Sequence, residues 1–165
     1  MSTPWADIAE SLRVELADYG GLLHLFEAQQ RGLFARNADL VLELSGEIER
    51  QAELLGVNRG QRERLVAEFA LAAGLPANST LRSLLPRFDA VARPLLEALI
   101  DEVNCLLHRV RRTSRHNHTL LASVVQTHRE TLQQLRPQAF PRTYAPSGRV
   151  AVNSAELTST MRATG

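Results

Sequence analysis

Residues Leu95–Arg136 read LLEALIDEVNCLLHRVRRTSRHNHTLLASVVQTHRETLQQLR, a run that contains neither Gly nor Pro. Apolar or small side chains recur along it at alternating steps of three and four residues, which keeps one seam along an α-helix. A second apolar row lies beside this seam and widens it. The pattern predicts a helix roughly 60 Å long that packs against two neighbours, and not a two-stranded zipper. The seam comprises Leu96, Leu99, Val103, Leu106, Val110, Thr113, Asn117, Leu120, Val124, Thr127 and Thr131.

Two further long helices are predicted before this stretch. The first begins near Thr3-Pro4, a cap followed by a proline at the first helical position. Asn37 is typical of a residue that caps a second helix, which Gly74 should end. A connector over residues 74–94 contains a short helix capped by Asn78-Ser79-Thr80 and closed by Pro86. The sequence does not decide whether Pro94 lies in the first turn of the long helix or kinks it.

After Arg136 the character of the chain changes, because Pro137, Pro141, Pro146 and Gly148 break any helix. We therefore expect a helical domain over residues 1–136 and a flexible C-terminal tail over residues 137–165. The predicted fold is all-α, an elongated antiparallel helical bundle of three long helices plus a short connector helix.

Composition limits the function. The chain has 165 residues, 44% of them hydrophobic, which is enough for one shared core. The single cysteine, Cys105, excludes an internal disulfide framework. The sequence shows neither a signal peptide nor an apolar window of membrane-spanning length, so we expect a cytoplasmic protein without stable membrane insertion.

Charge is unevenly distributed along the chain. Residues 1–70 hold 7 Arg against 12 Asp and Glu, and residues 71–165 hold 12 Arg against 6 acids. The two halves could complement each other in a folded hairpin. The run from Arg109 to Arg115 could instead contact phosphates, but no DNA-binding motif or stacking aromatic accompanies it, so nucleic-acid binding is disfavoured.

Motifs for catalysis or for cofactors are not found. The sequence has no glycine-rich phosphate loop, no HExxH and no G-x-S-x-G, so we expect a protein that is not an enzyme. Cys105 and His108 lie three residues apart on the long helix, but no second pair completes a four-ligand zinc set. We expect no metal site and no cofactor.

Asn117 interrupts the apolar seam where a leucine would stabilise the bundle more. Two explanations stay open. A buried polar residue can fix the register of packed helices. Alternatively, the side chain makes a contact that only a binding partner completes.

The C-terminal part of the sequence resembles the FlgN family of flagellar type III export chaperones. His116-Asn117-x-x-Leu120-Leu121 is followed by Leu135-Arg136-Pro137 and then by Thr143-Tyr144-x-x-x-Gly148. The preceding helices are similar in kind only. Ala145-Pro146 departs from the family, which tends to have Gly directly after the tyrosine, and the connector looks longer than usual.

The resemblance implies a chaperone that binds the C-terminal helical segments of the hook-associated proteins FlgK and FlgL. It would prevent their premature assembly and deliver them to the export gate. The family's post-helix tyrosine, associated with docking to the gate protein FlhA, corresponds to Tyr144; alternatively, Tyr144 pins the tail to the bundle. We expect the cargo on the C-terminal part of the long helix, at Asn117, Leu120, Leu121, Val124, Val125, Leu132 and Leu135.

The main alternative comes from a different class of protein. A helical hairpin with a long apolar seam can associate with itself and act as an adaptor or structural protein. A chaperone exposes its apolar groove when free, whereas a self-associating hairpin buries it in an oligomer. Weak self-association is compatible with either function.

Overall fold

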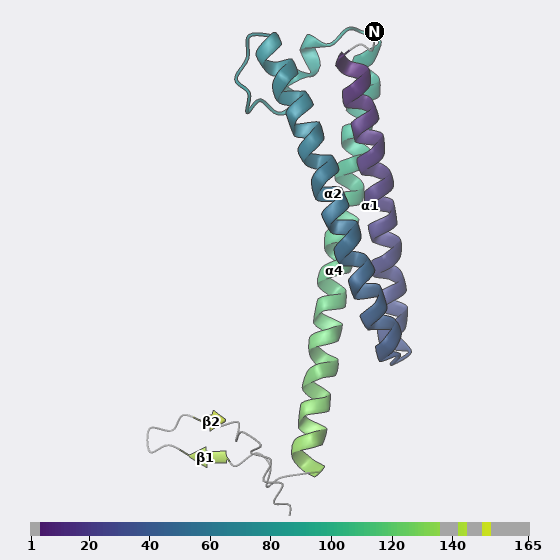
Figure 1. Ribbon diagram of the computed structural model, residues 1–165, viewed down its shortest axis with the longest axis vertical. Helices are drawn as coiled ribbons and strands as arrows, with labels where there is room; N and C mark the ends of the chain where they lie inside the picture. Colours follow the sequence, from purple (N-terminus) through teal and green to yellow (C-terminus); the bar gives the residue numbers. More distant parts are fainter. Residues whose placement is uncertain (1–3, 136–141, 145–149, 153–165) are drawn as a thin grey trace, which may run out of the picture. The chain divides into compact units, whose positions relative to one another are not determined.

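The computed structural model describes residues 4–135, 142–144 and 150–152. It consists of α1 (Pro4–Phe34), α2 (Ala38–Ala72), α3 (Leu81–Leu84), the 3-10 helix η1 (Leu85–Arg87), α4 (Ala92–Leu135) and two short strands (Figure 1). The chain divides into two compact units, residues 1–120 and 121–165. The helical prediction is confirmed, with α1, α2 and α4 as the long helices.

α1 and α2 form an antiparallel pair joined by a tight turn (Figure 1). The amide of Asn37 bonds to the carbonyl oxygen of Gly32 and that of Arg36 to Leu33, the arrangement of a Schellman cap. Arg36 takes the left-handed position, with φ of 55°, where glycine is usual. The Asn37 side chain accepts a bond from the Leu40 amide at 3.1 Å, which confirms the predicted cap of α2.

The connector between α2 and α4 follows the sequence closely. Gly74 ends α2 with φ of 72°, and Thr80 caps α3 by accepting a bond from the Ser83 amide. Pro86 does not close the segment at once, because η1 continues through it to Arg87. A 3-10 helix tolerates proline in its first turn, where the missing N–H has no partner to lose.

α4 begins at Ala92, so Pro94 lies within its first turn and causes no kink there. The carboxylate of Asp89 accepts bonds from the amides of Val91 and Ala92, at 3.0 and 2.6 Å. These are free amides at the N-terminus of a helix, and an acidic side chain satisfies them.

The hydrophobic core draws on α1, α2, the connector and α4. Buried residues of all these elements share one cluster, and burial on the long seam stops at Asn117. The ring of Phe88 stacks on that of Phe69 at a centroid distance of 4.2 Å, which anchors the connector to α2. The buried centre of the core contains Ile8, Leu12, Leu22, Val66, Ala70, Leu84, Leu96, Leu99, Val103 and Val110.

The strands were not predicted. β1 (Arg142–Tyr144) pairs antiparallel with β2 (Val150–Val152), with Thr143 opposite Ala151 and Tyr144 opposite Val150. These six positions lie in the segment expected as a flexible tail, so the helical class predicted for residues 1–136 is unaffected. Val150 and Val152 are β-branched and Tyr144 is aromatic, residue types that favour strands. The rest of the predicted tail, and the predicted cap at Thr3, lie outside the described residues.

Candidate functional site

Asn117 lies in the interior of the helical unit, with 3% of its surface exposed. Its amide nitrogen donates to the backbone carbonyl oxygen of Phe26 at 2.7 Å and to the side-chain oxygen of Gln29 at 3.0 Å. Gln29 in turn donates to Ser45 on α2 at 3.0 Å. One polar layer thus joins all three long helices, which supports the register explanation. The Asn117 oxygen is buried without a hydrogen-bond partner among the described residues, and the expected cargo contact of Asn117 stays a prediction.

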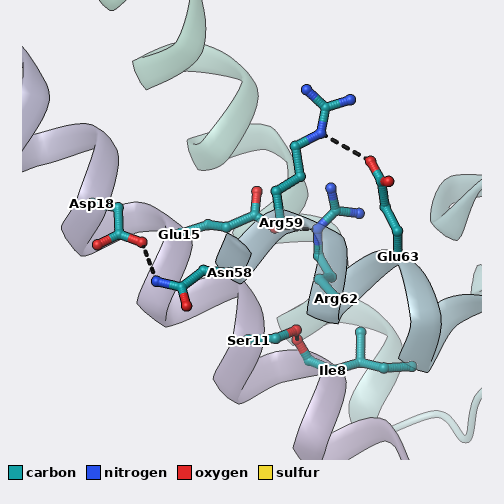
Figure 2. Close-up of polar contacts among 8 residues, drawn as sticks. All are labelled: Ile8, Ser11, Glu15, Asp18, Asn58, Arg59, Arg62 and Glu63. Carbon is teal, nitrogen blue, oxygen red and sulfur yellow. Dashed lines mark hydrogen bonds and ion pairs between the residues drawn. The ribbon is translucent and has the colours of Figure 1, made fainter. Parts of the chain in front are cut away.

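A second polar layer joins α1 to α2, and the sequence analysis missed it (Figure 2). Glu15, only 1% exposed, forms an ion pair with Arg62. Asp18 accepts a bond from Asn58 at 2.6 Å and one from Gln51 at 3.3 Å. A signal was present in the sequence, because Glu15 follows Leu12 by three residues and precedes Tyr19 by four, at seam spacing.

Two groups close to this layer have shifted pKa values. Burial raises the pKa of the Tyr19 phenol, and the negative charge of Glu15 raises it further. The hydrogen bond to Glu63, 2.9 Å long, raises the pKa of the Arg59 guanidinium. One carboxylate oxygen of Glu15 and both of Asp18 contact α2, so this layer ties the two helices together.

The expected cargo residues beyond Asn117 lie together on α4. Leu120 is half-buried, whereas Leu121, Val124, Val125, Leu132 and Leu135 are exposed, Leu135 to 73%. At 3.6 residues per turn, these five exposed positions fall within an arc of about 100°. The buried residues Leu96, Val103 and Val110 fall in the same arc. One apolar face of α4 is therefore buried up to Asn117 and exposed from Leu121 onward, and we call its exposed part the apolar stripe.

The arginines of α4 do not pair with the acidic first half of the chain. Arg109, Arg111, Arg112 and Arg115 are all exposed. The ion pairs among residues 4–135 are Arg13–Glu10, Arg59–Glu63, Arg62–Glu15 and Arg82–Asp101, and none includes these four arginines. Among residues 4–135, these arginines therefore form no ion pair with the acidic first half.

The remaining candidate residues lie on β1 and α4. Tyr144 lies in β1, opposite Val150. Cys105 and His108 are exposed on α4, and within the part of the chain that the structure describes no three potential ligands gather to hold a metal ion. None of the described helices is long and apolar enough to cross a membrane.

The comparisons with known proteins bear on this architecture. No curated protein and no solved structure matches the chain. The family described as FlgN protein matches residues 5–151, which covers every helix and strand except the first residue of α1 and the last of β2. A match over most of the chain confirms the resemblance seen in the sequence. This protein belongs to the FlgN family, the family of flagellar export chaperones.

Proposed function

We propose that this protein binds the C-terminal helical segments of the hook-associated proteins FlgK and FlgL in the cytoplasm. It prevents their premature assembly and delivers them to the flagellar type III export gate. The observation that carries the proposal is the apolar face of α4, which is buried as far as Asn117 and exposed from Leu121. A chaperone needs an apolar surface that no part of its own bundle covers.

The spacing of the apolar stripe fits a helical partner. Leu121, Val125 and Leu132 lie on consecutive turns or pairs of turns of α4, so their side chains line one side of the helix. An amphipathic helix recognises such a surface through its own residues at steps of three and four. The segments that assemble the hook–filament junction are helical and apolar. When such a segment lies on the apolar stripe as a helix, its own apolar face is covered.

The test of this function is an assembly assay. Purified FlgK or FlgL is concentrated with and without the protein, and association is followed by light scattering. We expect an equimolar amount of the protein to suppress scattering. Leu121→Asp should abolish the suppression, because a carboxylate on the stripe would be desolvated on binding. Val57→Asp, at an exposed apolar position on α2, is the matched control and should suppress scattering normally.

Delivery is assigned to Tyr144, on the strength of its place in the family motif. We propose that it docks the loaded chaperone to the gate protein FlhA. The test measures binding of the cytoplasmic domain of FlhA to the protein and to Tyr144→Ala. We expect weaker FlhA binding with unchanged cargo binding. A sharp fall in melting temperature would instead support a role for Tyr144 in pinning the tail.

A further inference from the structure

One tract of α4 has an unusual charge pattern. From Val103 to Arg129 the helix contains no Asp or Glu at all, although solvent-facing helix surfaces usually mix charges of both signs. Every basic side chain in it is exposed. We call this set the basic tract; it comprises His108, Arg109, Arg111, Arg112, Arg115, His116, His118, His128 and Arg129.

No side chain of the basic tract takes part in an ion pair within residues 4–135. The ion pairs found over residues 4–135 use other arginines, and the buried acids Glu15 and Asp18 are bonded to α2. The nearest acid before the tract that forms an ion pair is Asp101, which pairs with Arg82. Arg115 uses its Nε to donate to the carbonyl oxygen of Arg111, a bond within its own helix.

This arrangement costs helix stability. Arg109 and Arg112 are three residues apart, as are Arg112 and Arg115, and Arg111 lies four before Arg115. Like charges at these spacings repel, by roughly 0.2–0.5 kcal/mol per pair. A partner that brings carboxylates to the tract would remove this repulsion and add ion pairs in which the arginine fork holds a carboxylate by two bonds.

We propose that the basic tract binds a cluster of Asp and Glu residues in the cargo segment. The inference rests on the proposed function and adds the chemistry of the ligand: an apolar helix face accompanied in the cargo sequence by an acidic cluster. The pattern favours a polypeptide over a nucleic acid, because α4 contains no Phe, Tyr or Trp on which bases could stack. Charges of this kind speed encounter and set specificity more than they add affinity.

The experiment uses peptides from the FlgK and FlgL C-termini of the same organism, each made also with its acids replaced by Asn and Gln. Binding to the full chain is measured by calorimetry at low and at high NaCl. The variant is Arg112→Glu with Arg115→Glu. The matched control is Arg31→Glu with Arg64→Glu, two exposed arginines of α1 and α2 that give the same change of net charge.

We expect the variant to bind the native peptide roughly tenfold more weakly at low salt, and the loss to shrink at high salt. The control should bind as the wild type does. With the acid-free peptide, wild type and variant should bind alike. Equal binding of the native peptide by wild type and variant would overturn this inference and leave the proposed function intact. No peptide binding by the folded wild type would overturn both.

A labelled single-stranded oligonucleotide gives the remaining arm of the experiment. Its binding is followed by fluorescence anisotropy over the same range of salt. The inference would be overturned in favour of a nucleic acid by two results together. Oligonucleotide binding would be salt-sensitive and depend on Arg112 and Arg115, and peptide binding would not depend on these two arginines. We expect no such dependence.

Discussion

The side-chain amide of Asn117 on α4 donates a hydrogen bond to the backbone carbonyl oxygen of Phe26 on α1, 91 positions earlier in the chain. The bond is 2.7 Å long, and a second one joins the same amide nitrogen to Gln29. A leucine here would bury more apolar surface but could not choose between neighbouring registers of α4. Asn117 can donate at one register only, so it fixes α4 against the helix pair.

Asn117→Asp should therefore destabilise the bundle strongly. The carboxylate that replaces the amide cannot donate to Phe26 or Gln29, and it places a charge at a buried position. We expect a loss of about 2–3 kcal/mol in the free energy of unfolding, measured by urea denaturation. Asn104→Asp, the same change at an exposed position of α4, should cost little. Equal losses for the two variants would contradict the register role.

The ion pair between Glu15 and Arg62 should matter far more than the one between Arg59 and Glu63. Arg62→Met leaves the Glu15 carboxylate buried without a partner, which should cost about 3 kcal/mol. Arg59→Met removes an exposed pair one turn away and should cost less than about 1 kcal/mol. Adding Glu15→Gln to Arg62→Met should recover part of the loss. Thermal unfolding of the wild type and these three variants measures each step.

Substitutions at the ends of α1 and α2 should change the stability of the protein in opposite directions. Arg36→Gly should stabilise the protein by about 1 kcal/mol, because glycine adopts the left-handed conformation without steric cost. Gly74→Ala should destabilise it by a similar amount for the same reason. Denaturant midpoints measured side by side provide the check. A destabilising Arg36→Gly would mean that the arginine side chain contributes more than its backbone strain costs.

Tyr19 gives the protein a sensitivity to alkali. Its pKa is raised in the folded state by burial and by Glu15, so the folded protein holds the phenol proton more tightly than the unfolded chain does. This contribution to stability is fully present below the ordinary pKa of about 10 and is lost as the pH rises through the raised pKa. Tyr19→Phe should flatten the decline of the melting temperature above pH 10. An unchanged decline would assign it to other groups.

Much of this architecture was predictable, because helix ends and apolar spacing are local signals. Asn37, Gly74 and Thr80 act where their residue types indicate. The polar layer of Glu15 and Asp18 was not predicted, since only the facing residues of α2 show that these acids are buried. The sequence likewise does not predict that burial on α4 ends after Asn117. Apolar side chains recur at helical spacing on both sides of Asn117. Leu121 differs from Val110 in being exposed, because no neighbouring element covers it.

The predicted cargo site also has a part that local sequence signals predict and a part that they do not. Leu121, Val124, Val125, Leu132 and Leu135 share one exposed face, as the helical spacing requires. Asn117 lies on that face by spacing but packs against α1, which no periodicity can reveal. Only the family motif singles out Tyr144, and helical spacing cannot predict its pairing with Val150 in β1.

The most direct measurement of the central claim is calorimetry of the full chain against C-terminal peptides of FlgK and FlgL from the same organism. We expect saturable binding of one peptide per chain. Leu132→Asp should abolish this binding and Val57→Asp should retain it. Circular dichroism should show unchanged helicity in both variants. Failure of the folded protein to bind either peptide, with the apolar stripe instead buried in a stable oligomer that Leu132→Asp dissociates, would contradict the central claim.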